Sequence, residues 1–98
     1  MGIEHESRPR PCLGFREREP GRLQLRVGLF DGEGVCDVEL QETDELVAVE
    51  LFVCGDATDR THICDCPVHV YLDKPLDERP VIDLTTGRTV TERQARRN

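Results

Sequence analysis

Regular alternation of apolar and polar residues constrains the fold of this chain more than any other feature. In residues 22–30, RLQLRVGLF, every second residue is Leu or Val, and most residues between them are polar. Alternation with a period of two is typical of a β-strand that has one buried face. The same pattern recurs in residues 35–41, 46–54 and 67–72, and turn-forming segments such as DGEG at 31–34 separate the runs.

These runs predict an all-β fold. Two shorter β-prone segments, 79–83 and 88–90, flank LTTG, whose Gly87 suits a tight turn. Because no long helical periodicity is present, we expect an antiparallel meander of five or six strands that forms a small sandwich or open barrel. Residues 91–98 are expected to form either a short helix, with Thr91 and Gln94 as a capping box, or a disordered tail.

Chain length and the positions of Pro and Gly predict the domain organisation. A chain of 98 residues is expected to form one domain. Residues 1–21 contain three Pro and a terminal Gly among alternating charges, so we expect an irregular lead-in before a single β domain at 22–90. The sequence has neither a run of about 18 apolar residues nor a signal-peptide core, and we therefore expect a cytoplasmic protein without a membrane segment.

The charge distribution argues against nucleic acid as a ligand. The net charge is −7, and residues 23–87 contain fifteen acidic but only four basic residues. An acidic body repels phosphate groups, so we expect no nucleic-acid binding. The acidic residues are expected to keep the protein soluble, and contact with a basic partner is the alternative interpretation.

Residues 54–66, CGDATDRTHICDC, concentrate the residue types that bind metals. Cys54, His62, Cys64 and Cys66 are candidate ligands for a tetrahedral zinc ion. The C-x-C spacing is tighter than that of a usual zinc knuckle. A disulfide from Cys54 to Cys64 or Cys66 is a second interpretation, and closing a loop of about a dozen residues would stabilise the fold by roughly 3 kcal/mol. Unbonded structural thiols are the third.

The alternation also assigns each cysteine to a face of its strand. Cys36 and Cys66 share the parity of their strands' apolar residues, so we predict that both are buried free thiols. Cys54 has the opposite parity and should react first, with Cys12 as its competitor. The loop 55–63 has few apolar residues to anchor it and is expected to be exposed and mobile.

Functional motifs are sparse. A Cys–His pair is the enzymatic alternative, but His69 is predicted to face away from Cys66. The sequence contains no Gly-rich phosphate loop, no G-x-S-x-G and no H-E-x-x-H. We therefore expect a non-enzymatic accessory domain that binds a protein partner or self-associates, without a cofactor unless zinc is bound. The predicted contact surface is the outward face of the sheet, formed by Arg22, Arg26, Phe52, His69 and Tyr71.

The segment 66–88, CPVHVYLDKPLDERPVIDLTTGR, resembles the C-terminal part of small uncharacterised proteins of actinobacteria and their phages. Those proteins share the pattern C-P-V-x-V-x-L-x-x-P-L-x-x-R-x-V-x-D. The matching positions here are Cys66, Pro67, Val68, Val70, Leu72, Pro75, Leu76, Arg79, Val81 and Asp83. The resemblance implies no activity, cofactor or partner. The residues of the segment themselves predict a strand, a turn and a second strand. Leu76 is expected to enter the core, and Arg79 is expected to pair with Asp83 or with a carbonyl.

Overall fold

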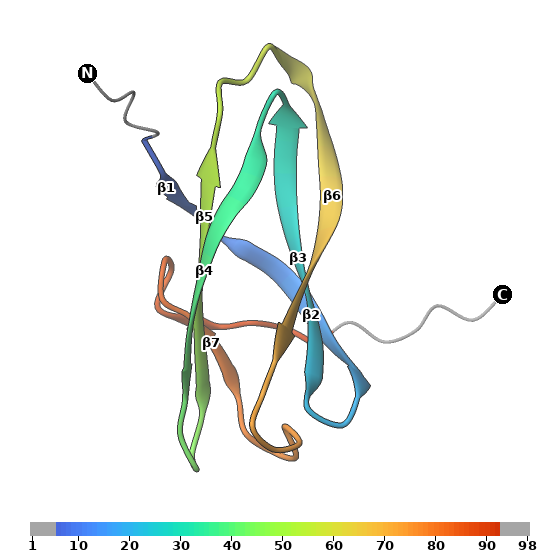
Figure 1. Cartoon of the computed structure of the whole chain (residues 1–98), viewed down its shortest axis with the longest axis vertical. Helices are drawn as coiled ribbons and strands as arrows, with labels where there is room; N and C mark the ends of the chain where they lie inside the picture. Colours follow the sequence, from blue (N-terminus) through green and yellow to red (C-terminus); the bar gives the residue numbers. More distant parts are fainter. Residues whose placement is uncertain (1–5, 93–98) are drawn as a thin grey trace, which may run out of the picture.

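The computed structural model describes residues 6–92, and these residues form two β-sheets (Figure 1). No helix is present among them, which confirms the predicted all-β class. The strands are β1 (Arg8–Arg10), β2 (Cys12–Glu19), β3 (Arg22–Asp31), β4 (Gly34–Glu42), β5 (Val47–Cys54), β6 (Asp59–Tyr71), β7 (Val81–Asp83) and β8 (Arg88–Thr89).

Sheet A is organised around β5, and sheet B around β3. In sheet A, β4 pairs with the whole length of β5, and β1 and β7 pair with its two halves, β7 in parallel. β8 then pairs with β7. In sheet B, β3 lies between β2 and β6, and all pairs are antiparallel. The order departs from a simple meander because β3 pairs with β6, so the β4–β5 hairpin between them in the chain belongs to the other sheet (Figure 1).

The hydrophobic core lies between the two sheets. The alternating apolar residues of β3 and β5 meet there, and most are completely buried. The buried core residues are Phe15, Leu23, Leu25, Val27, Val47, Val49, Leu51, Val70, Leu76, Val81 and Val90. Burial of such side chains contributes roughly 1.5–3 kcal/mol each, so this two-layer contact is the main source of stability. Leu76 enters the core as predicted.

Part of the segment predicted as an irregular lead-in, residues 1–21, is regular structure. β1 and β2 lie within it, and they raise the strand number above the predicted five or six. The alternation of β2 is hard to recognise because its register against β3 shifts twice, between Cys12 and Gly14 and between Glu17 and Glu19. Each shift is a β-bulge, which moves the following side chains to the other face.

The loop predicted at 55–63 is shorter than expected. β6 begins at Asp59, so only residues 55–58 connect β5 to β6. Residues 59–63 are exposed, as predicted, but the two ends of this segment pair with the end of β3, Ile63 with Phe30 and Asp59 with Asp31, across a register shift. Backbone pairing with β3 therefore orders a segment that has little apolar anchoring.

The predicted C-terminal helix falls mostly outside the described residues, as does Gln94 of its capping box. Within them, the backbone N–H of Phe15 donates a hydrogen bond to the carbonyl of Thr91, and Glu92 forms a β-bridge with Phe15. The last described residues thus follow β2 in an extended conformation. No helix in residues 6–92 is long and apolar enough to cross a membrane.

Candidate protein-binding face

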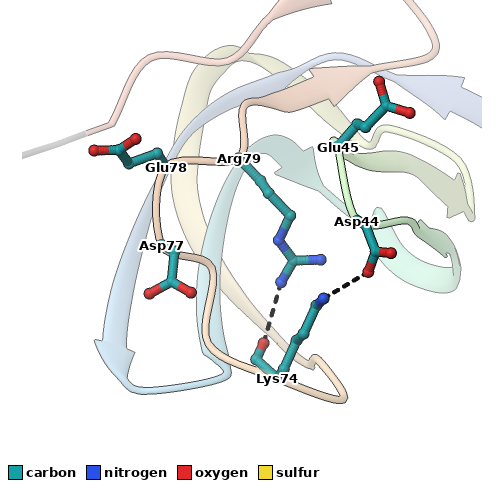
Figure 2. A pocket seen from close by; sticks show the side chains of 6 residues that line it. All are labelled: Asp44, Glu45, Lys74, Asp77, Glu78 and Arg79. Carbon is teal, nitrogen blue, oxygen red and sulfur yellow. Dashed lines mark hydrogen bonds and ion pairs between the residues drawn. The ribbon is translucent and has the colours of Figure 1, made fainter.

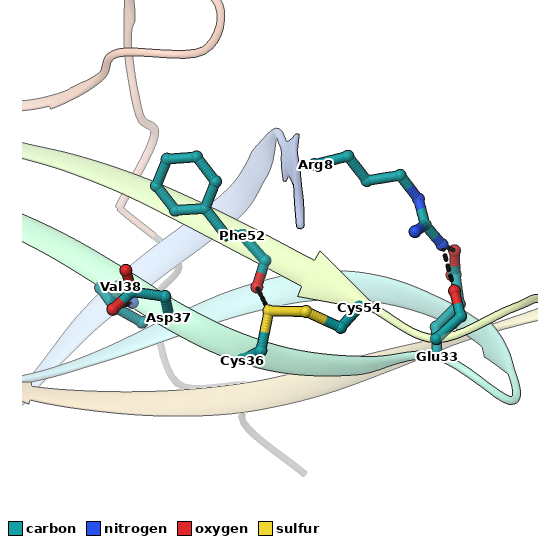
Figure 3. The surroundings of a disulfide bond; sticks show 8 residues. Arg8, Glu33, Cys36, Asp37, Val38, Phe52 and Cys54 are labelled. Carbon is teal, nitrogen blue, oxygen red and sulfur yellow. Dashed lines mark hydrogen bonds and ion pairs between the residues drawn. A yellow bond between two sulfur atoms is a disulfide. The ribbon is translucent and has the colours of Figure 1, made fainter. Parts of the chain in front are cut away.

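Cys36 and Cys54 form a disulfide bond, which corrects the prediction that Cys36 is a buried free thiol (Figure 3). A β-bulge explains the difference. Val35 pairs with Val53 and Asp37 pairs with Phe52, so Cys36 is an extra residue on β4. The extra residue reverses the alternation, places Cys36 on the exposed side and brings it next to the outward Cys54. The predicted bridge from Cys54 to Cys64 or Cys66 is therefore also wrong.

The disulfide removes Cys54 from the predicted zinc site. His62, Cys64 and Cys66 remain, and they line one pocket beside Leu29 and Phe30. Within residues 6–92, no group of three or more His, Cys, Asp or Glu side chains is arranged to hold a metal ion. Cys66 is a free thiol, as predicted, but it is only half buried and packs against the core from its margin.

A second pocket, of about 550 Å³, is lined by Arg79 together with Lys74 and four acidic residues (Figure 2). Arg79 is buried and donates hydrogen bonds to the carbonyl oxygens of Thr43, Lys74, Pro75 and Leu76. It also pairs with the Glu42 carboxylate at 3.1 Å. The backbone N–H of Asp73 and the Arg79 guanidinium hold the pKa of Glu42 below its ordinary value. Because these carbonyl oxygens and the Glu42 carboxylate already engage the guanidinium of Arg79, we assign this pocket a structural role.

The outward face of sheet B, which points away from sheet A, is the best candidate for a binding surface. The register places Arg22 opposite Tyr71, Gln24 opposite His69, and Arg26 opposite Pro67. These residues alternate with the buried Leu and Val residues of β3, so they share the other side of the sheet. The β2–β3 pair adds Arg16, opposite Gln24.

Arginine dominates one half of this face. A pocket of about 370 Å³ is lined by Arg16, Arg18, Gln24 and Arg26, together with Phe15. Arg26 pairs with Asp65 at 2.8 Å, and Arg22 lies 3.5 Å from the exposed carboxylate of Glu19. Arg18 forms no ion pair within residues 6–92. The face is therefore positively charged although the whole chain carries a net charge of −7.

Exposed side chains with apolar surface lie at both ends of this face. Ile63 is 59% exposed and lies over Gly28, beside Leu13, which is 48% exposed. Next to them, the Arg60 guanidinium lies 5.7 Å from the centre of the Phe30 ring. At the opposite end of the face Tyr71 is 69% exposed. Arginine and aromatic residues beside apolar ones are the composition that protein interfaces favour.

Four of the five residues predicted for the contact surface lie on this face, namely Arg22, Arg26, His69 and Tyr71. Phe52 does not, because it lies on β5 in sheet A, beside the disulfide (Figure 3). The sequence-based prediction also missed Arg16 and Arg18, since it treated their segment as irregular. The run RERE at 16–19, with Arg at every second position, was the available signal.

The outward face of sheet A has the opposite charge. Glu39 lies directly opposite Glu50, and Asp37 lies opposite Phe52. Like charges opposite each other in a sheet are destabilising, and neither glutamate forms an ion pair within the described part of the chain. The residues that the register places on this face of β1, β4, β5 and β7 include no Arg or Lys.

Comparison of the chain with protein-family models, with curated proteins and with solved structures finds no match.

Proposed function

We propose that this protein is a small binding module without catalytic activity, and that it binds a protein partner through the outward face of sheet B. The observation that carries the proposal is the exposure of Leu13, Ile63 and Tyr71 on the same face as a group of arginines. Exposed apolar groups cost free energy in water, and burial against a partner removes that cost. Tyr and Arg are also the residues that most often dominate binding energy.

The proposed partner presents an acidic surface with an apolar centre. The guanidinium groups of Arg16, Arg18, Arg22 and Arg26 would pair with its carboxylates, and Arg forms two parallel hydrogen bonds to a carboxylate. Nucleic acid remains the less favoured occupant, because the acidic remainder of the molecule repels phosphate. Electrostatic steering would accelerate association with an acidic protein, and salt would slow it.

Capture experiments with matched variants test this proposal. Immobilised wild-type protein, Arg22→Gln/Arg26→Gln and Arg88→Gln are each exposed to extracts of the cells that produce the protein, and the retained proteins are identified by mass spectrometry. Arg88 is exposed and lies on β8 of sheet A, so its variant removes the same type of charge away from the face. A partner that the wild type and Arg88→Gln retain, and the double variant loses, is the expected result. Equal retention by all three would contradict the proposal.

The disulfide between Cys36 and Cys54 is relevant to the cellular compartment of the protein. The sequence suggests the cytoplasm, but disulfides are rare there because cellular reductants keep thiols reduced. We infer that the folded protein resides at least partly in an oxidising environment. Rapid alkylation of thiols in intact cells, followed by peptide mapping, tests this inference. Cys36 and Cys54 should escape alkylation until a reductant is added, and their immediate alkylation would favour the cytoplasm.

A further inference from the structure

The two outward faces of this molecule are complementary in charge. Sheet B presents Arg16, Arg18, Arg22 and Arg26, and sheet A presents Asp37, Glu39 and Glu50. The faces lie on opposite sides of the two-layer structure, so they cannot neutralise each other within one molecule. A surface that attracts the basic face is thus present on every copy of the chain.

A cation from outside the molecule would relieve the repulsion between two carboxylates of the acidic face. Glu39 and Glu50 are neighbours across the β4–β5 pair, where like charges repel. The ion pairs formed by arginines near β4 and β5 do not relieve this repulsion, because Arg8 and Arg10 pair instead with Glu33 at the start of the hairpin. An arginine supplied from another molecule would remove the repulsion and form a new ion pair.

Apolar groups accompany both charged surfaces. Phe52 lies opposite Asp37 on the acidic face, and Pro9 is its partner on β1. On the basic face, Tyr71 lies beside Arg22. A contact between the two faces can therefore combine a small apolar centre with surrounding ion pairs, as protein interfaces do.

We propose that the partner of the basic face is a second copy of this chain, bound head to tail through its acidic face. The inference rests on the proposed function, because it names the occupant of the same surface. Two different faces meet in such a contact, so each added copy leaves one basic and one acidic face open. The expected assemblies are short filaments or closed rings that grow with concentration, rather than a twofold symmetric dimer.

Sedimentation of the purified protein tests the proposal. Wild-type protein at low salt should show an average mass that rises with concentration beyond that of a dimer. Raising the salt from about 20 mM to about 500 mM should shift it towards the monomer, because charges are then screened over a few ångströms. Each of the double variants Arg22→Gln/Arg26→Gln and Glu39→Gln/Glu50→Gln should weaken association by about tenfold or more.

An equimolar mixture of the two double variants is the most direct test that the basic face of one copy binds the acidic face of another. One variant keeps its acidic face and the other keeps its basic face, so together they should form heterodimers that grow no further. Arg88→Gln and Glu78→Gln, which change exposed charges elsewhere, should associate like the wild type. Circular dichroism melting of every variant verifies that each is folded.

Several outcomes would overturn the head-to-tail inference. These are a monomeric wild type at low salt up to about millimolar concentration, growth that stops at a dimer, and association that neither double variant weakens. The proposed function is tested separately, by the capture experiment with cell extracts. A monomeric protein that still retains a different acidic protein, in a manner that requires Arg22 and Arg26, would refute self-association and support the binding module. Self-association that is independent of those arginines would refute the head-to-tail contact alone, and the capture experiment would still decide the proposed function.

Discussion

Cys36 and Cys54 are joined by a disulfide across the β4–β5 pair, with their Cα atoms 5.8 Å apart (Figure 3). The bond links a bulged residue of β4 to the last residue of β5. It therefore fixes the position of the bulge and of the turn that precedes it. Disulfides that close loops of this size contribute roughly 3 kcal/mol to stability.

The disulfide determines which thiols react. Three cysteines lie outside the disulfide, and Cys64 is the exposed one among them. We expect maleimide to label Cys64 first in the folded protein, and the half-buried Cys12 and Cys66 more slowly. Peptide mapping should find Cys36 and Cys54 labelled only after reduction. Rapid labelling of Cys54 in unreduced protein would contradict the disulfide.

Acid should weaken the fold through Glu33. Hydrogen bonds from the Arg10 guanidinium, the Phe30 backbone N–H and Arg8 overcome the effect of burial and lower the pKa of this carboxyl from 4.5 to about 2. The ionised form is therefore favoured in the folded state. Its stabilisation is complete above pH 4.5 and is lost as the pH falls towards 2.

Replacement of Glu33 by Gln tests this linkage. We expect Glu33→Gln to lower the free energy of unfolding at neutral pH by on the order of 2 kcal/mol, after allowance for solvent screening. The difference from the wild type should shrink as the pH falls below 4.5. Urea unfolding at several pH values measures it, with the exposed Glu78→Gln as the control. A difference that stays constant with pH would exclude Glu33 as the titrating group.

Arg79 should be essential for the loop at 72–80. Substitution of Arg79 by Met keeps the apolar length but removes the side-chain donor to the carbonyls of Thr43, Lys74 and Pro75. We expect a loss of about 3 kcal/mol in the free energy of unfolding. Lys74→Met removes only an exposed ion pair with Asp44 and should have almost no effect. Similar stability of the two variants would refute the structural role of Arg79.

Two glycines should be irreplaceable where the turn after β3 packs on the turn after β5. Gly32 and Gly55 have φ values of 94° and 93°, and an added Cβ at either position would collide with backbone oxygen of the other turn. Alanine at either position should cost about 3 kcal/mol, more than the conformational penalty alone. Gly34→Ala is the control, because no atom lies within 4 Å of its added Cβ. Thermal unfolding compares the three variants, and equal melting temperatures would contradict the tight packing.

Alternation in the sequence was sufficient to predict the strands that form the centre of each sheet. The burial of Leu23, Leu25 and Val27 in β3 and of Val49 and Leu51 in β5 follows directly from their spacing. That inference is reliable because the twofold period of a strand is a local property, and one buried face requires apolar residues at alternate positions. The same reasoning placed Cys54 on the outward face of its strand, and the turn at Pro75 and Leu76 predicted correctly that Leu76 is buried.

The partners of these strands could not be predicted from alternation and are known from the folded structure alone. The bulge that turns Cys36 outward depends on the register between β4 and β5, and a shift of one residue reverses every following side chain. The basic face likewise requires β2 and β6 to pair with opposite edges of β3, which brings Arg16 and Tyr71, far apart in the chain, onto one surface. Alternation within a strand cannot encode such pairings, because they arise from the hydrogen bonding and packing of segments that are distant in sequence.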